Sequence, residues 1–318
     1  MTDRPYNPIP HKQIHPALQF LIFMGMSVGV LIIGSFIGIA IILAVFGMHT
    51  VNDIMTLNVT SHQAQNALWI LQLIGTTLPI LLTPVFFAYV IVREPEDYLK
   101  TTFHFSWLLI VIVFLTMILS NPLIEFLGNI NEKMVLPKFL KGVEDWMRDS
   151  ENSAKKLSDS MMEMKTFASM LFDLIFIGLV TAIAEEFMFR GCLQTIFIRW
   201  MKNKHVAVWI TAILFSAFHM EFFGFLPRLL LGVLFGYFTV WSGSVWPAVW
   251  AHFINNGTVV VVTYLFQHKL ITLNPDESQS FSYAGYIISF IITLFLLFIY
   301  RYISNKRQIA DINGEELD

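Results

Sequence analysis

Residues 167–191, FASMLFDLIFIGLVTAIAEEFMFRG, carry the pattern that decides the fold. Asp173 is the one ionisable residue in this stretch before Glu185. A run of this length and apolarity predicts a helix that crosses a bilayer, since roughly 20 apolar residues span the hydrocarbon core. We expect this span to run from about Phe167 to Phe189, with two adjacent carboxylates close to its end.

The rest of the chain has the same bias, because 56% of its 318 residues are hydrophobic and 14% are charged. Soluble domains carry about 25% charged residues, so a soluble enzyme and a disordered chain are both excluded. A net charge of −3 argues against a nucleic-acid partner, and a single cysteine excludes a disulfide scaffold. We predict an all-α transmembrane bundle of about eight spans, the others at 18–46, 67–92, 107–127, 206–223, 225–241, 245–266 and 283–302.

A polar segment at 129–165 separates the third span from the fourth. We expect an amphipathic helical hairpin or a surface loop outside the membrane. Lys and Arg gather in cytoplasmic loops. With the N-terminus in the cytoplasm, the short outer loops hold Arg228 and Lys269, and the cytoplasmic segments hold Arg4, Lys12, Arg93, Lys100, Arg199, Lys202, Lys204, Arg301, Lys306 and Arg307. We therefore predict that both termini are cytoplasmic, in the inner membrane if the source is bacterial.

Ionisable residues at membrane depth form the first motif, at Glu185, Glu186 and Arg190. Each costs about 2.5–3.5 kcal/mol on insertion scales, so each needs a reason to be there. Adjacent helical residues point about 100° apart, so the two glutamates face different ways. Glu186 and Arg190 share a face, which predicts a buried salt bridge. Glu185 is then free to accept a proton or bind a metal. The alternative is one charge network near a helix end.

Two histidine motifs follow on later spans. Phe215 and His219 are four residues apart on one helical face, and so are His252 and Asn256. The second pair is suited to bind a metal, or to stabilise a peptide carbonyl oxygen as negative charge develops on it. The alternative for each polar residue is a hydrogen bond between helices without a chemical role. We expect Glu221 to be a solvated helix end and Asn255 to point elsewhere.

Convergence of the three motifs on one site would bring together the carboxylate of Glu185 and the imidazoles of His219 and His252. A carboxylate with two imidazoles is a set that activates water, with or without zinc. The spacing shows which faces these residues occupy, and their convergence is a prediction.

The ordered motifs resemble those of the CPBP family of CAAX-protease and bacteriocin-processing membrane proteins, also called the Abi family. Its pattern is Glu-Glu-x-x-x-Arg, then Phe-x-x-x-His, then His-x-x-x-Asn or Asp, and the resemblance covers residues 184–257. It implies an intramembrane endopeptidase in which Glu185 and His219 hold the catalytic water. It also implies an oxyanion site at His252 and Asn256, with Glu186, Arg190 and Phe215 in supporting roles.

The resemblance also implies a division into N-terminal spans and loop (1–165), a catalytic core (166–266), and a final span with a cytoplasmic tail (267–318). It leaves the metal open, since a zinc mechanism at Glu185, His219 and His252 and a metal-free glutamate mechanism use the same residues. The expected partners are membrane lipid and a peptide or protein substrate within the membrane, of which a prenylated CAAX protein is one form. The alternatives are a non-proteolytic scaffold or immunity protein of the same family, and a transporter.

Overall fold

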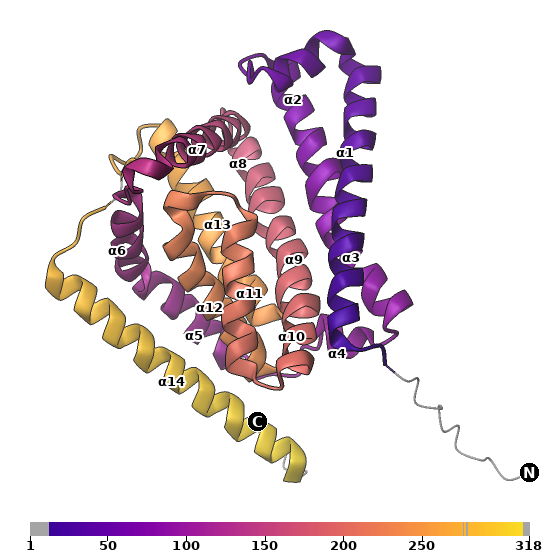
Figure 1. The fold of residues 1–318 in the computed structure, drawn as a ribbon. Coiled ribbons are helices and arrows are strands. Elements are labelled where there is room, and N and C mark those ends of the chain that lie inside the picture. Colours follow the sequence, from indigo (N-terminus) through magenta and orange to yellow (C-terminus); the bar gives the residue numbers. More distant parts are fainter. Residues whose placement is uncertain (1–12, 276, 278, 314–318) are drawn as a thin grey trace, which may run out of the picture.

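The computed structural model describes residues 13–275, 277 and 279–313, and within them the chain is helical with no strand (Figure 1). The predicted all-α fold is confirmed. The α-helices are α1 (Pro16–Met55), α2 (His62–Ile70), α3 (Leu78–Phe86), α4 (Pro95–Leu99), α5 (Leu108–Leu119), α6 (Asn121–Glu132), α7 (Lys141–Met161), α8 (Phe167–Asp173), α9 (Thr181–Glu186), α10 (Gln194–Met201), α11 (Lys204–Phe218), α12 (Phe225–Ser242), α13 (Trp246–Gln267) and α14 (Tyr283–Asn313).

Shorter helical segments complete this order. Four are π-helical, and they continue neighbouring α-helices without a break: η1 (Leu71–Thr77), η2 (Phe87–Ile91), η4 (Leu174–Val180) and η5 (Phe187–Leu193). Two are 3₁₀ turns, η3 (Lys138–Leu140) and η6 (Phe222–Gly224). Because of the π-helical joins, α2 to η2 form one long span, and α8 to α10 form another.

Six helices in the described part of the chain are long and apolar enough to cross a membrane, so the protein is an integral membrane protein: Pro16–Met55, His62–Ile91, Phe167–Met201, Phe222–Ser242, Trp246–Gln267 and Tyr283–Lys306. The pair α5 and α6, bent by 43°, adds a seventh if it is one span. The prediction of about eight spans was too high. Helix α11 has 15 residues and rises about 22 Å, short of a hydrocarbon core of roughly 30 Å.

Glycines explain how the short α11 is held in the bundle. A Cβ at Gly232 of α12 would lie 3.0 Å from the Ala212 Cβ, and one at Gly236 would lie 2.8 Å from a methyl of Val208. Small residues four positions apart let membrane helices approach closely. Contact along α12 therefore fixes α11, whose C-terminal residue is followed by His219.

Most of the polar segment at 129–165 lies in one long helix, α7, rather than in a hairpin or a loop, with its first residues in α6 and a short turn at η3. No Gly or Pro interrupts residues 143–161, so this stretch has no turn signal. Helix α7 lies across one end of the bundle (Figure 1). Its Trp146 ring is 5.3 Å from the Phe222 ring, and its Ser160 hydroxyl donates to the Val59 carbonyl at 2.8 Å. It thus connects the N-terminal spans with the later helices.

The end of the bundle opposite α7 brings together loops that are distant in sequence (Figure 1). Arg199 pairs with Glu94 at 2.6 Å, and the Val245 amide donates to the Lys100 carbonyl at 2.9 Å. Several predicted cytoplasmic Lys and Arg residues therefore share one end of the molecule. Arg4 and Lys12, which also supported that prediction, lie outside the described residues.

Candidate active site

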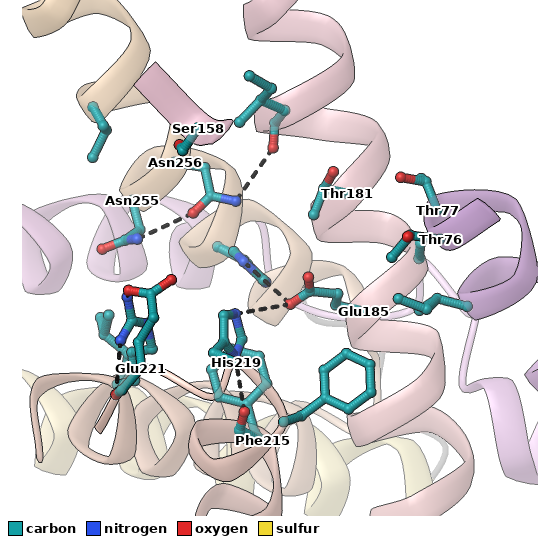
Figure 2. Close-up of a pocket in the computed structure, with 18 of the residues that line it drawn as sticks. Thr76, Thr77, Ser158, Thr181, Glu185, Phe215, His219, Glu221, Asn255 and Asn256 are labelled. Carbon is teal, nitrogen blue, oxygen red and sulfur yellow. Dashed lines mark hydrogen bonds and ion pairs between the residues drawn. The ribbon is translucent and has the colours of Figure 1, made fainter. Parts of the chain in front are cut away.

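A cavity of about 560 Å³ lies among the later helices, the second span and the C-terminal part of α7 (Figure 2). All three sequence motifs contribute to its wall. Its polar lining residues are Glu185, His219, His252, Asn255 and Asn256, together with Gln72, Thr76, Thr77, Ser158, Thr181, Glu221 and Arg228.

Glu185 lies in the middle of the Phe167–Met201 span, in α9. The expected helix end near Phe189 was wrong, because the helix continues through η5 and α10. Arg190 does not end the helix, since its charge is neutralised by Glu186 within the same helix. Glu185 therefore lies near the middle of its span, and its position along the helix does not place the site closer to either membrane leaflet.

The Glu185 carboxylate faces both imidazoles. Its Oε2 atom is 3.9 Å from Nε2 of His219 and 3.9 Å from Nε2 of His252 (Figure 2). This oxygen is buried and has no hydrogen-bond partner among the described residues. The two separations exceed direct hydrogen bonds, and polar groups at such a spacing are where a bridging water fits. The geometry therefore offers a water site contacted by a carboxylate and two rings.

Hydrogen bonds on the far side of each ring fix its orientation. His219 Nδ1 lies 2.9 Å from the Phe215 carbonyl oxygen, and His252 Nδ1 lies 2.8 Å from Glu186 Oε1. A carbonyl only accepts, so His219 Nδ1 carries a hydrogen. An ionised carboxylate also only accepts, so His252 Nδ1, which faces Glu186, carries a hydrogen as well. In their neutral forms both rings then present an Nε2 lone pair toward Glu185, and each can accept a hydrogen bond from water.

The predicted salt bridge between Glu186 and Arg190 is confirmed. The two side chains are fully buried, with Arg190 Nη1 2.7 Å from Glu186 Oε1. Arg190 also donates to the Gly232 carbonyl at 3.3 Å. Glu186 Oε1 thus contacts Arg190 and His252 at once, and it orients the imidazole from behind the cavity wall.

Phe215 packs against both the ion pair and the rings. The Arg190 guanidinium lies 4.2 Å from the centre of its ring, and the imidazoles of His219 and His252 lie 4.9 and 5.8 Å from it. An aromatic face next to a buried cation adds to its stabilisation. Phe215 therefore positions the site, through both its ring and its carbonyl oxygen.

Asn255 and Asn256 both line the cavity, so the expectation that Asn255 points elsewhere was wrong. Asn256 Nδ2 donates to the Ile177 carbonyl at 3.3 Å, and Asn255 Nδ2 donates to Asn256 Oδ1 at 3.2 Å (Figure 2). These two hydrogen bonds fix the orientation of the Asn256 side chain. An amide nitrogen carries two hydrogens, so the second hydrogen of Asn256 Nδ2 is available.

Residues 167–258 match the family described as type II CAAX prenyl endopeptidase Rce1-like. The uncharacterized protein YpbD of Bacillus subtilis (strain 168) is 30% identical over 140 residues, which covers 38% of this chain and 69% of YpbD. The chain belongs to the Rce1-like family. No solved structure matches it. The predicted relationship to CAAX proteases is confirmed, and the matched residues, hereafter the Rce1-like core, contain all three motifs.

The wall of the cavity contains an ion pair that the sequence did not indicate. Glu221 lies just beyond the end of α11 and is partly exposed, as expected of a solvated helix end, and it also pairs with Arg228 at the cavity wall. Glu151 of α7 accepts a hydrogen bond from the Phe223 amide at 3.2 Å. Burial raises the pKa of Glu151, and the nearby Glu221 carboxylate raises it further. Charged groups therefore gather where α7 meets the Rce1-like core.

The second span supplies a neutral polar wall opposite the Rce1-like core. Gln72, Thr76 and Thr77 come from η1, and Gln72 Nε2 lies 3.4 Å from Thr77 Oγ1. These residues were missed in the sequence, although their spacing is that of neighbours on one helical face. The π-helical geometry of η1 is common at functional sites.

No group of three or more His, Cys, Asp or Glu side chains in the described part of the chain is arranged to hold a metal ion. Zinc bonds of about 2.0–2.2 Å place neighbouring ligand atoms roughly 3.5 Å apart. Glu185 is 3.9 Å from each imidazole nitrogen, so the predicted set of Glu185, His219 and His252 needs a small side-chain shift to bind zinc. A metal role for these residues stays a prediction.

Proposed function

We propose that this protein is an intramembrane endopeptidase that hydrolyses peptide bonds of membrane-associated substrates with a water activated by Glu185. The observation that carries the proposal is the buried Glu185 oxygen without a hydrogen-bond partner among the described residues, 3.9 Å from two imidazole nitrogens at the wall of a cavity. Membership in a peptidase family supports the same reaction.

The residues suggest specific roles. Glu185 accepts a proton from the water while the water oxygen bonds to the peptide carbonyl carbon. His219 accepts a hydrogen bond from the same water and so orients it. The carbonyl oxygen becomes an oxyanion, for which the second hydrogen of Asn256 Nδ2 is a donor. His252 is a second donor in its doubly protonated form, with the extra proton taken up from solvent before the substrate binds. Glu185 then gives its proton to the leaving amine as the C–N bond breaks.

Zinc bound at Glu185, His219 and His252 would supply Lewis acidity to the same water. The protein's own contribution is then the orientation of the two rings by Phe215 and Glu186, described above. Metal content therefore distinguishes two forms of one proposal, and each form requires Glu185 and His219.

The proposed orientation places both termini in the cytoplasm, from the loop charges. Helix α7 then lies on the opposite face of the membrane. Labelling tests this placement, because Cys192 is buried and free. We expect an impermeant maleimide to label Lys156→Cys on exposed α7 in intact cells, and not Lys202→Cys at the other end. The reverse pattern would show the opposite orientation.

The activity is tested on the full chain in lipid nanodiscs. The probes are a library of randomised decapeptides and a farnesylated peptide with a CAAX end, with products read by mass spectrometry. We expect Glu185→Gln and His219→Ala to lower cleavage at least about 100-fold while thermal stability is retained. Glu96→Gln, an exposed control, should cleave normally. Full activity in Glu185→Gln would contradict the mechanism, and no cleavage by the wild type would favour a scaffold.

Elemental analysis of the same preparations tests the metal. About one zinc per chain, lost in both variants, would place a metal at these residues. An active preparation without zinc or another metal would favour the glutamate mechanism. Cleavage of the farnesylated peptide in preference to the library would support a prenylated CAAX substrate.

A further inference from the structure

A second cavity of about 320 Å³ lies between the second span, α7 and η4. We call it the side chamber. It shares part of its wall with the cavity that contains Glu185, and the shared residues are Gln72, Thr77, Ser158, Ile177 and Thr181. The side chamber therefore adjoins the candidate active site.

The wall of the side chamber differs from that of the main cavity. Beyond the shared residues it is formed by Trp69, Leu73, Ala154, Leu157, Met161 and Phe176. All six are apolar, and no residue in this wall is ionisable. By contrast, Glu185, His219, Glu221 and Arg228 line the main cavity.

Aromatic contacts order two side chains of this wall, Trp69 and Phe176. The Trp69 ring is 4.8 Å from the Phe172 ring and 6.3 Å from the Phe176 ring, in edge-to-face arrangements. The Phe172 and Phe176 rings are 4.5 Å apart. Such a cluster restricts ring motion and offers a rigid surface for an apolar group.

We propose that the side chamber binds one large apolar side chain of the peptide substrate, such as Leu, Met or Phe, and so selects the bond that is cleaved. This inference rests on the proposed peptidase function. Transfer of such a side chain from water into an apolar site is favourable. The polar Gln72, Thr77 and Thr181 belong to the wall that the two cavities share. They match the hydrogen-bonding groups of a peptide backbone whose side chain enters the side chamber.

The polar residues of the shared wall also favour a peptide over a lipid chain as the occupant. A lipid tail gains nothing from the Gln72 amide or from the hydroxyls of Thr77 and Thr181. A peptide gains both hydrogen bonds and apolar burial along the same path. Most of the wall comes from residues 69–77 and 154–161, outside the Rce1-like core. The selectivity is thus supplied by elements added to the core.

Filling the side chamber tests the proposal. Ala154 lines the side chamber and not the main cavity, so Ala154→Phe adds bulk away from Glu185. Val143→Phe adds bulk to an exposed position of the same helix and is the matched control. In the randomised library we expect the wild type and Val143→Phe to prefer large apolar residues at one position. We expect Ala154→Phe to lose about tenfold of that preference. Unchanged preference in an active Ala154→Phe would overturn the proposal.

Cross-linking gives a readout that does not need cleavage. The probe is the same library with one photoreactive benzoylphenylalanine, bound to Glu185→Gln protein in nanodiscs. We expect a cross-link to Met161 or Leu73 that Ala154→Phe abolishes and Val143→Phe keeps. Absence of that cross-link would overturn the side chamber as a substrate site, even if cleavage were normal. Labelling of the same residues by a phosphatidylcholine with a photoreactive acyl chain, unaffected by peptide, would assign the side chamber to lipid and overturn the proposal as well.

Discussion

The main cavity is bounded by two regions with different chemistry. On one side the Rce1-like core supplies Glu185, His219 and His252, and on the other the second span and α7 supply the neutral Gln72, Thr77 and Ser158. Ionisable groups at membrane depth need partners, and the core provides them through the buried pair of Glu186 and Arg190. The neutral wall needs no such support. This contrast indicates that the core is constrained by its buried charges and that the added elements can adapt to a substrate.

The largest effect should follow from removing the cation of the core. Arg190→Met leaves the Glu186 carboxylate buried without its guanidinium partner, and breaking such a pair costs about 3–5 kcal/mol of unfolding free energy. Arg228→Met at the cavity wall is the matched control, because its pair with Glu221 is partly exposed. We expect that control to lose less than about 1 kcal/mol. Unfolding in detergent, followed by tryptophan fluorescence, measures both, and equal losses would contradict the contrast between the regions.

A smaller effect should follow from separating α11 and α12. Gly236→Val adds a side chain whose Cβ alone would lie 2.8 Å from a methyl of Val208 and 2.9 Å from Gln194 Oε1. Overpacking of this kind costs about 1–3 kcal/mol, and it should also move His219 and lower cleavage. Gly25→Val in α1 is the control, since no atom lies within 4 Å of its Cβ position. A large loss of stability in Gly25→Val would show that the N-terminal span is as tightly packed as the core.

The sequence predicted the helices best where Gly and Pro mark their ends. The spans expected at 225–241 and 245–266 correspond to α12 and α13. Helix α12 has its C-cap at Gly243, with φ +72°, and Pro247 lies in the first turn of α13. The span expected to end near Phe189 continues to Met201. Hydropathy could not show this, because the charge of Arg190 is hidden by a partner one turn away in the same helix.

Helical spacing predicted which site residues share a face, and it could not give distances between helices. The ion pair of Glu186 and Arg190 depends on one helix and was predicted correctly. The bond from His252 to Glu186 depends on the packing of two spans and was missed. The expected position of Asn255 was wrong, and the contact of Glu221 with the cavity was missed, for the same reason, since a cavity wide enough to reach adjacent residues is a property of the bundle. Neutral residues such as Thr77 were missed because a single hydroxyl in an apolar span does not by itself indicate a functional site.

The smallest effect should come from the neutral wall, and it would sharpen the contrast between the two regions. Thr77→Val removes one hydroxyl from the cavity with little change of shape. If this hydroxyl binds the substrate backbone, its loss costs about 1 kcal/mol, which raises KM roughly fivefold and leaves kcat and stability unchanged. Thr83→Val is the control in the same span. Thr83 is buried, donates to the Pro79 carbonyl at 2.8 Å and does not line the cavity. Steady-state cleavage of one library-derived peptide measures both variants. A fall in kcat for Thr77→Val would show that the wall takes part in the reaction itself, whereas equal KM values for the two variants would show that the hydroxyl does not contact the substrate.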